Sequence, residues 1–236
     1  MLGRVGSVTA AELPIGERKA QAVEEMFDRI APRYDLVNRV MTLGLDSGWR
    51  RRAVRELRLT AGAHVVDLGC GTGDLCRALE RSGLSGVGVD MAAGMLAKAR
   101  TTAPLVRADA LALPLRDGSV DGAISGFALR NVVDIGACFD EAARVIRPGG
   151  RAVFLEVSEP RNPVLRRLHA LYFRRIVPLV GGLISDRRAY RYLPASTAYL
   201  PPPDGLLDLL ARSGFVHRRR VVLGAGAAQL LIGIRR

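Results

Sequence analysis

Residues 64–75, HVVDLGCGTGDL, change from an apolar run to three alternating glycines, Gly69, Gly71 and Gly73, and then to an acid, Asp74. A short apolar run of this kind predicts a buried strand. Glycine reaches backbone conformations that strain other residues, and it lets another group come close to the backbone. The stretch therefore predicts a strand followed by a ligand-binding loop. The ligand is left open at this point between a phosphate, a dinucleotide and another molecule.

Outward from this stretch, strand-like and helix-like segments alternate. Further strands are predicted at 86–90, 105–109, 120–127 and 151–158, with helices at 74–83, at 92–100 and from residue 135 to a stop at Pro148-Gly149-Gly150. Strands separated by helices indicate a mainly parallel, doubly wound α/β sheet, because right-handed crossovers need those helices. Two apolar runs, 216–224 and 227–234, predict a closing antiparallel hairpin around Gly224-Ala225-Gly226.

Helical segments flank this core. Residues 17–30 place apolar side chains at helical spacing, and an arginine-rich helix is predicted at about 47–58. Residues 160–203 interrupt the alternation and predict a helical insertion, after which a helix has Asp204 as its N-cap and Gly214 as its C-cap. We therefore expect a flexible N-terminus at 1–16 and a single domain at 17–236, with an N-terminal helical cap at 17–60 and the insertion at 160–203.

The composition limits the classes of function. The net charge is +12, and it is carried almost wholly by arginine, since Lys19 and Lys98 are the only lysines. Aromatic residues make up 5% of the chain and do not interleave with the arginine groups, which argues against a nucleic-acid partner. We interpret the arginine groups first as solvent-exposed faces of the protein. The second interpretation is contact with an anionic membrane surface. No apolar run of about 18 residues or signal peptide is present, so a cytoplasmic protein is expected, with peripheral contact at the inner face of the membrane as an option. Cys70, Cys76 and Cys138 have no metal-ligand spacing and predict buried, reduced thiols rather than a metal site.

The loop after the first strand is a poor match to phosphate-binding motifs. Counted from Gly69, the last glycine of a G-x-G-x-x-G fingerprint is replaced by Asp74, and no G-K-[ST] follows. An acid at a helix start repels a phosphate and suits a ligand that carries positive charge. Asp90 and Asp109 close the next two strands, where one can accept hydrogen bonds from both ribose hydroxyls and the other from an adenine amino group.

This arrangement resembles the class I S-adenosylmethionine-dependent methyltransferases. VVDLGCGTGD (65–74), VGVDMAAGML (87–96) and RADALALPLRDGSVDGAIS (107–125) are similar to their first three motifs. The resemblance implies a seven-stranded, Rossmann-like sheet with a reversed final strand and S-adenosyl-L-methionine as the cofactor. The cofactor set that it implies comprises Asp67, Gly69, Gly71, Thr72 and Gly73 at the methionine part, Asp90 and Met91 at the ribose, Asp109 and Ala110 at the adenine, and Gly126.

Further stretches resemble the ubiquinone/menaquinone biosynthesis C-methyltransferases. They are YDLVNRVMTLGLDSGWR (34–50), GFALRNVVD (126–134), RVIRPGGRAVFLEVSEP (144–160), and the insertion with AYRYLPAST (189–197). The chain departs from that family at Asp46, where many members carry histidine. It departs again at Gly224-Ala225-Gly226 and Leu231, where a Thr-Gly-Gly turn and a histidine are usual. If that histidine touches the acceptor, the acceptor here differs from the usual quinol.

The resemblance implies C-methylation of a prenylated quinol, with demethylmenaquinol favoured and the ubiquinone precursor as the other option. Arg130 is expected to stabilise a phenolate, and Asn131 and Tyr34 to orient a hydroxyl or relay a proton; the alternatives are a structural ion pair for Arg130 and a packing contact for Tyr34. The insertion is expected to accept an isoprenoid tail at a membrane surface, or to be a plain helical cap. A small aromatic metabolite is the rival acceptor, a nucleic acid is less favoured still, and a homodimer is possible.

Overall fold

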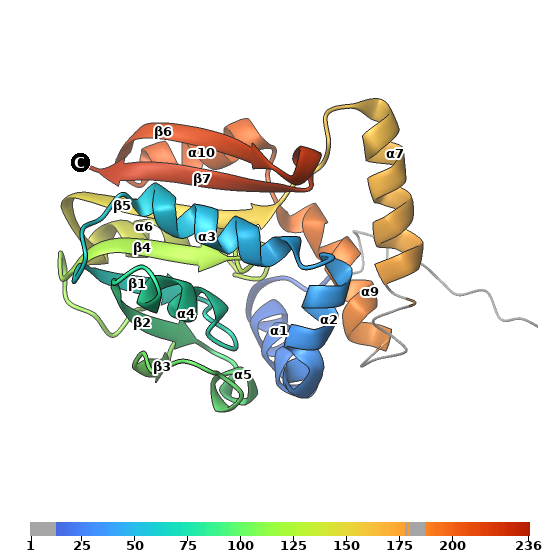
Figure 1. Cartoon of the computed structure of the whole chain (residues 1–236), viewed down its shortest axis with the longest axis horizontal. Coiled ribbons are helices and arrows are strands. Elements are labelled where there is room, and N and C mark those ends of the chain that lie inside the picture. Colours follow the sequence, from blue (N-terminus) through green and yellow to red (C-terminus); the bar gives the residue numbers. More distant parts are fainter. Residues whose placement is uncertain (1–12, 178, 180–186) are drawn as a thin grey trace, which may run out of the picture.

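Seven strands form one sheet in the order β3-β2-β1-β4-β5-β7-β6 in the computed structural model, which describes residues 13–177, 179 and 187–236 (Figure 1). The strands are β1 (His64–Leu68), β2 (Ser85–Asp90), β3 (Leu105–Arg107), β4 (Val120–Gly126), β5 (Ile146–Val157), β6 (Phe215–Leu223) and β7 (Ala228–Arg235). The first five pair in parallel, and β7 runs antiparallel to both β5 and β6. The expected seven-stranded α/β sheet with a reversed last strand is therefore confirmed.

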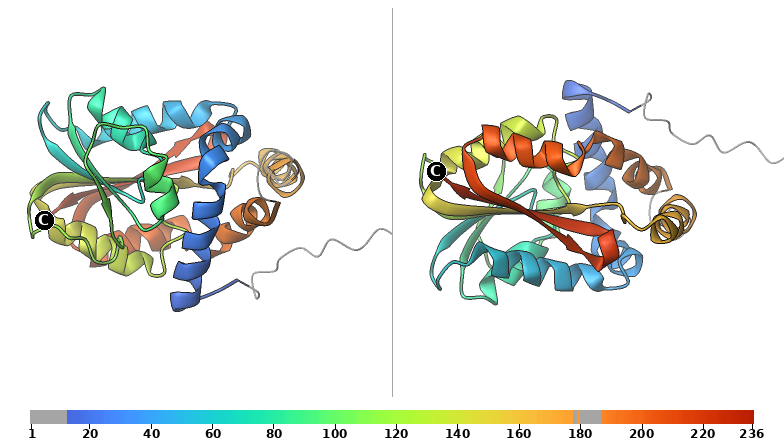
Figure 2. Two further views of the ribbon diagram at one scale, coloured as in Figure 1. Left: turned by 90° about the horizontal axis from the view of Figure 1, so that it is seen from below. Right: turned by 90° about the horizontal axis from the view of Figure 1, so that it is seen from above.

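Helices cover both faces of the sheet, as Figure 2 shows. On one face α3 (Leu45–Leu57) and α4 (Asp74–Glu80) pack on a core that includes Val65, Ile124 and Val153. On the other face α6 (Ile135–Val145) and α10 (Pro203–Arg212) pack on a core that includes Val66 and Phe154. Because successive side chains of a strand point to opposite faces, the neighbours Val65 and Val66 serve different layers.

A third group of helices lies across the end of the sheet where the parallel strands finish (Figures 1 and 2). It comprises α1 (Gly16–Ile30), η2 (Ala31–Arg33), α2 (Tyr34–Met41), α7 (Pro163–Leu171), η3 (Tyr172–Ile176), α9 (Arg187–Ser196) and η4 (Thr197–Tyr199). In α1, Met26 and Ile30 are buried with Val37 of α2 and Ala189 of α9. Tyr199 of η4 donates a hydrogen bond of 2.5 Å to the carbonyl of Pro14. The cap and part of the insertion are thus one layer over the sheet edge.

Several boundaries differ from those expected. Helix α6 ends at Val145, and Ile146 already pairs with Val120, so Pro148-Gly149-Gly150 form an irregularity inside β5 instead of stopping a helix. Strand β3 ends at Arg107, two residues before Asp109. Helix α10 has Pro202 as its N-cap and carries Asp204 in its first turn, where a carboxylate still favours the helix dipole. The expected flexible N-terminus at 1–16 falls mostly outside the described residues.

Candidate active site

A cavity lies at the carboxyl ends of β1, β2, β3 and β4, beneath α1. Its walls come from α1, from the loops after β1, β3 and β4, and from the end of β2 with the start of α5 (Ala93–Ala97). The predicted site residues that line it are Tyr34, Gly69, Gly71, Asp90, Met91, Asp109, Ala110, Gly126 and Asn131. The predicted residues Asp67, Thr72, Gly73 and Arg130 are not part of its lining. The fold therefore gathers side chains from four separate strand ends into one space.

The backbone donors of the glycine loop point into the protein. Gly69 and Cys70 donate their N–H groups to the carbonyl of Val89 at 2.8 and 3.0 Å. Gly71 donates to Oδ2 of Asp90 at 2.8 Å, and Gly73 to the carbonyl of Cys70 at 2.9 Å. A phosphate-binding loop needs such N–H groups free to face the anion. This loop therefore favours a ligand without phosphate.

The backbone conformation and the packing of the loop after β1 require glycine. Gly69, Gly71 and Gly73 have φ values of +66°, +55° and +80°, in the region that favours glycine. A Cβ added to Gly69 would lie 2.6 Å from Cβ of Ala128, and one added to Gly73 would lie 2.9 Å from Cγ2 of Thr101. The approach of the β4–α6 loop to Gly69 brings the two walls of the cavity together.

Asp90 and Asp109 present carboxylates to the cavity at neighbouring strand ends. The two oxygens of Asp90 accept hydrogen bonds from the N–H groups of Gly71 and Ala92, at 2.8 and 2.9 Å. Oδ1 of Asp109 accepts from Leu111 N–H at 2.9 Å. Each carboxylate oxygen has a second lone pair, so both side chains can still accept from a ligand. Burial raises the pKa of Asp90, and the two backbone hydrogen bonds oppose that rise.

Asp67 lies fully buried behind the loop. Its Oδ2 accepts from the Cys76 thiol at 3.4 Å, and its Oδ1 has no hydrogen-bond partner among the residues that the structure describes. Burial raises the pKa of this carboxyl to about 7. A buried carboxylate of this kind favours a positive charge nearby, and the S-adenosylmethionine predicted from the motifs carries an ammonium and a sulfonium; the cavity wall itself does not include Asp67.

Asp74 differs from its expected role. Its carboxylate forms an ion pair with Arg77 and lies 3.5 Å from Nη2 of Arg50. Two arginines thus compensate the negative charge at the start of α4. The Asp74 carboxylate is therefore paired within the protein and does not face a cationic ligand. Thr72 also bonds within the chain, since its hydroxyl donates to Oδ1 of Asp35 on α2 at 2.5 Å.

Tyr34, Phe127 and Asn131 form the wall of the cavity beyond the glycine loop. The Tyr34 hydroxyl is in hydrogen-bond contact with Asn38, and burial raises its pKa, so Tyr34 is protonated at neutral pH. Asn131 donates to the carbonyl of Phe127 at 3.3 Å and accepts from the Tyr192 hydroxyl of α9 at 3.3 Å. Phe127 has φ +62°, a rare conformation for an aromatic residue and one that clusters at functional sites.

Arg130 forms a buried ion pair. Its Nη1 lies 2.6 Å from Oε1 of Glu156 and donates to the carbonyl of Phe127 at 2.7 Å. The backbone N–H of Arg130 also donates to Glu156, at 3.2 Å. The guanidinium therefore ties the end of β5 to the β4–α6 loop, which is the alternative that the sequence left open for this residue.

Several residues at the site were not singled out in the sequence. Val23 and Phe27 of α1 line the cavity, although the sequence marked them only as part of a helical stripe. The buried Arg50 lies with its guanidinium carbon 5.5 Å from the centre of the Phe127 ring. Tyr192 lies in the AYRYLPAST stretch, but nothing in the sequence pairs it with Asn131. Only the fold brings these residues together, since they come from α1, α3 and α9.

Two departures from the family pattern can now be placed. Leu231 is fully buried in the core layer with Phe139 and Phe154, and the cavity wall does not include it. Asp46 accepts from the Thr42 hydroxyl at 2.9 Å and lies 3.5 Å from Nε of Arg50.

Among the described residues, no group of three or more His, Cys, Asp or Glu side chains is placed to hold a metal ion.

Comparison of the sequence with known proteins agrees with this geometry. The profile of the ubiE/COQ5 methyltransferase family matches residues 15–235. A demethylmenaquinone methyltransferase of Roseiflexus castenholzii is 45% identical over 95% of this chain and 98% of its own length. A ubiquinone/menaquinone biosynthesis C-methyltransferase of Syntrophotalea carbinolica is 41% identical over 92% of this chain and 96% of its own.

Solved structures show the same fold. An S-adenosylmethionine-dependent methyltransferase from Thermotoga maritima, described as a possible histamine N-methyltransferase, superposes with a TM-score of 0.65 at 21% identity. That match covers 91% of this chain and 100% of the other. The sequence matches span nearly the whole chain, and the cavity suits the donor. The chain therefore belongs to the ubiE/COQ5 methyltransferase family and is an S-adenosylmethionine-dependent methyltransferase.

Proposed function

We propose that this protein transfers a methyl group from S-adenosylmethionine to a ring carbon of a prenylated quinol, with demethylmenaquinol as the acceptor. The observation that carries the proposal is the wall formed by Tyr34, Phe127 and Asn131 beside the donor end of the cavity. It supplies an aromatic face and two polar groups, which suit a flat ring with hydroxyl substituents. The curated relatives of this chain that are named demethylmenaquinone methyltransferases support this acceptor.

When bound, the donor would supply an electrophilic methyl group: its carbon–sulfur bond breaks as the new carbon–carbon bond forms, S-adenosylhomocysteine is released, and the methylated ring carbon loses its proton to solvent. The Phe127 ring in the cavity wall offers a face on which the quinol ring could lie flat and present a ring carbon to the donor. Tyr34 is protonated, so its hydroxyl can donate a hydrogen bond to an acceptor oxygen, and the Asn131 amide can hold a second polar group. Holding two reactants in line in this way contributes about 7–11 kcal/mol to lowering a barrier.

Arg130 acts in this proposal as a positioning residue. Its guanidinium is neutralised by Glu156 and holds the carbonyl of Phe127, and the same carbonyl accepts from Asn131. Arg130 therefore fixes the strained Phe127 and the adjacent Asn131 in the geometry that faces the acceptor. The field of the guanidinium also reaches the hydroxyl of Tyr34, where it favours negative charge.

The acceptor tail explains the layer of helices at the sheet edge. A prenylated quinol resides in a membrane, so the protein works at the membrane surface and the insertion accepts the emerging tail. No helix in the described part of the chain is long and apolar enough to cross a membrane. Contact with the lipid is accordingly peripheral.

The direct test is an assay of the purified protein with S-adenosylmethionine and reduced demethylmenaquinone, with mass spectrometry of the ring product. We expect one added methyl on the ring carbon next to a hydroxylated carbon. In cells, loss of the gene should lead to accumulation of the unmethylated quinone. A quinone profile that is identical with and without the gene, together with no product in vitro, would exclude this acceptor.

A small aromatic metabolite is the second candidate acceptor, and the altered tail at Gly224-Ala225-Gly226 is the observation that favours it. Gly224 packs against Trp49, whose ring contacts Phe127 at 6.4 Å between centroids, so the turn supports the acceptor wall indirectly. Turnover of tail-less aromatic phenols, compared with turnover of the quinol, separates the two candidates.

A further inference from the structure

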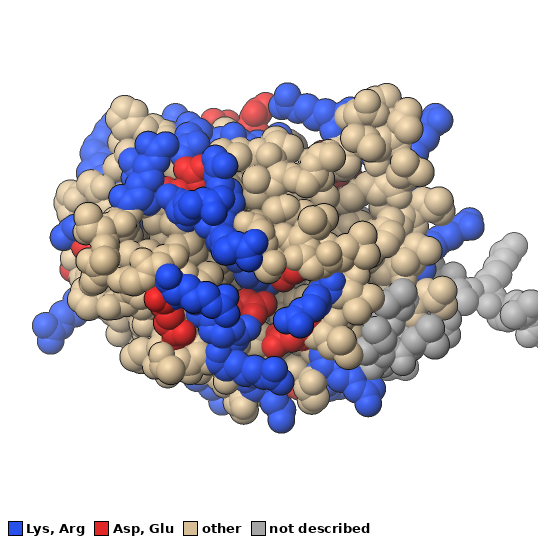
Figure 3. All heavy atoms as spheres, in the orientation of Figure 1, with Lys and Arg blue, Asp and Glu red and all other residues tan. Residues whose placement is uncertain are grey.

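Most of the exposed large apolar side chains in the described part of the chain gather at one end. They lie on α2, on the α2–α3 corner, and on α7 with η3: Leu36, Val40, Leu43, Leu45, Val164, Leu165, Leu168, Leu171 and Ile176. This is the end of the molecule where the parallel strands finish and the cavity lies (Figure 1). On the face shown in Figure 3, blue side chains gather over α3 and β6, and the end with α7 is mostly tan. We call this set of residues the α2–α7 face.

The corner between α2 and α3 holds a leucine in a strained conformation. Leu43 is 78% exposed and has φ +52°, and Gly44 follows it with φ +74°. Leucine is seldom found in the left-handed region, and such outliers persist where the surrounding structure fixes them. Here the N–H of Leu43 bonds to the carbonyl of Val40, and that of Gly44 to the carbonyl of Arg39. A rigid turn therefore presents an apolar side chain to the outside.

Helix α7 carries a matching stripe. Val164, Leu168 and Leu171 follow each other at helical spacing, and all three are exposed. Arg166 and Arg167 are exposed beside them. The sequence contains no Asp or Glu from residue 160 to residue 185. An apolar stripe whose charged neighbours in this stretch are cations matches the surface of an anionic bilayer. There the apolar acyl chains lie beneath a layer of anionic headgroups.

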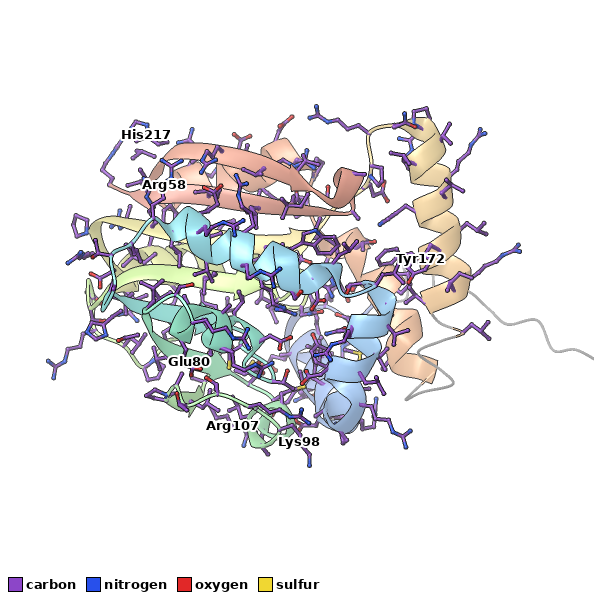
Figure 4. All side chains as sticks on the ribbon, in the orientation of Figure 1. Arg58, Glu80, Lys98, Arg107, Tyr172 and His217 are labelled. Atoms are coloured by element: carbon purple, nitrogen blue, oxygen red, sulfur yellow. The ribbon has the colours of Figure 1, made fainter. Side chains whose placement is uncertain are left out.

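The two parts of the face are connected. Tyr172, which follows α7, donates a hydrogen bond of 2.8 Å to the carbonyl of Met41 at the end of α2 (Figure 4). The one acid in α2, Asp35, is turned inward to the hydroxyl of Thr72, and Asp46 faces Thr42 and Arg50. These two carboxylates are thus engaged within the protein. Glu159, which is exposed just before α7, is an acid at the margin of the face, and the helix beyond it presents arginines to an outside partner.

We infer that the α2–α7 face docks onto an anionic phospholipid bilayer, with Leu43 and the α7 leucines inserted among the acyl chains and Arg166 and Arg167 at the headgroups. This inference rests on the proposed function for its purpose, since it places the cavity next to a membrane-embedded acceptor. The observations that support it are independent of the acceptor. A second copy of the chain would need carboxylates to meet these arginines, and the face itself offers none.

The test is co-sedimentation of the full chain with vesicles of phosphatidylcholine alone or mixed with phosphatidylglycerol, without methyl donor or acceptor. The wild-type protein should sediment with the anionic vesicles and much less with the neutral ones. The double variant Leu43→Asn, Leu168→Gln should partition at least about tenfold more weakly, because two apolar anchors are lost. Asn tolerates the left-handed conformation at 43, and Gln favours the helix at 168, so both substitutions suit the fold.

Two matched controls keep the result specific. Val222→Thr removes a 50% exposed apolar side chain from β6, outside the face, and should leave partitioning unchanged. Arg166→Gln with Arg167→Gln should abolish the preference for anionic vesicles and its salt sensitivity, whereas the α3 pair Arg51→Gln with Arg55→Gln should have a smaller effect. Methylation of a tail-less quinol should be unchanged in the leucine double variant, while methylation of a vesicle-embedded quinol should fall.

Three results would overturn the inference: no binding of wild-type protein to anionic vesicles at low salt, equal binding of the leucine double variant, or a change from dimer to monomer in that variant as its only effect. Failure of the proposed function has a different signature, since it would leave vesicle binding intact while no quinol is methylated.

Discussion

The backbone N–H of Gly71 donates a hydrogen bond of 2.8 Å to Oδ2 of Asp90, and so joins the loop after β1 to the acid that ends β2. The same carboxylate accepts from Ala92 N–H at 2.9 Å. Asp90 therefore has two tasks: it holds the glycine loop and it faces the cavity.

Replacing Asp90 tests both tasks. We expect Asp90→Ala to weaken S-adenosylmethionine binding by about tenfold to a hundredfold, because a hydrogen bond to a charged group contributes about 1.5–3 kcal/mol and the loop donor is left unpaired. Asp90→Asn, which keeps one acceptor oxygen, should lose less. Titration calorimetry gives the affinities. Asp117→Ala is the control: this side chain is 82% exposed at another surface, and its loss should leave the dissociation constant unchanged.

The carboxyl of Asp67 should make cofactor binding depend on pH. Burial raises its pKa from 3.8 to about 7, and a bound cation favours the ionised form. Affinity should therefore rise as the pH increases through about 7, by at most tenfold per pH unit for one proton. At pH 6, binding should release a proton, which calorimetry in two buffers of different ionisation enthalpy detects. If Asp67→Asn binds with the same pH profile as wild type, another group is responsible.

The same carboxyl affects stability with the opposite sign. Between about pH 4 and pH 7 the folded protein holds a proton on Asp67 that the unfolded chain has lost, so the free energy of unfolding should fall as the pH rises through this window. The contribution of one group is at most about 1.4 kcal/mol per pH unit. Urea denaturation of wild type and Asp67→Asn across this range measures it as the difference between the two slopes. Parallel slopes would mean that the carboxyl titrates normally.

Gly69 should tolerate no side chain. Gly69→Ala places a Cβ 2.6 Å from that of Ala128 at a φ of +66°, so backbone strain and a clash both act. Gly149→Ala is the matched control, because its φ is +81° but nothing lies within 4 Å of the new Cβ. We expect about 1–2 kcal/mol of lost stability from the backbone alone at Gly149, and clearly more at Gly69. Adding Ala128→Gly to Gly69→Ala should recover the part due to the clash, and no recovery would argue against it.

The buried pair of Arg130 and Glu156 should be costly to break from either side. Glu156→Leu or Arg130→Met should each lower stability by about 3–5 kcal/mol, because the remaining charge is buried without its partner. The combined Arg130→Met, Glu156→Leu variant should be more stable than either single variant. Thermal or urea unfolding measures this cycle. Asp117→Ala provides the contrast, because Asp117 is 82% exposed in its pair with Arg144, and the expected effect is about 0–1 kcal/mol. Purely additive effects at 130 and 156 would show that the pair does not interact.

Local patterns in the sequence were enough to predict much of the fold. Apolar runs bounded by glycine marked β1 and β2, because the spacing of apolar residues within an element shows its conformation. The alternation of strands with helices implied a parallel sheet, because parallel strands need crossover connections. The boundary of α6 was missed for a tertiary reason. Ile146 leaves the helix because it pairs with Val120, a contact that no local pattern reveals.

The glycine loop and the acids at the strand ends could also be found from spacing, since each follows its strand directly. The partners of those acids could not. Asp74 was interpreted as facing a ligand, but Arg50 from α3 and Arg77 compensate its charge. Arg130 carried two interpretations, and the position of Glu156 at the end of β5 decides that it forms an ion pair.

The class of sheet, the place of the cofactor loop and the methyltransferase family could be deduced from the sequence. Each depends on a short stretch of residues whose conformation is set locally. The packing of whole elements set which donors of that loop turn inward and which charges are neutralised. It also brings Phe27 of α1 to the cavity, and it places Arg50 of α3 against Phe127 and Tyr192 of α9 against Asn131 in the cavity wall. Contacts between residues distant in the chain depend on the packing of whole elements, and a linear pattern carries no record of that packing.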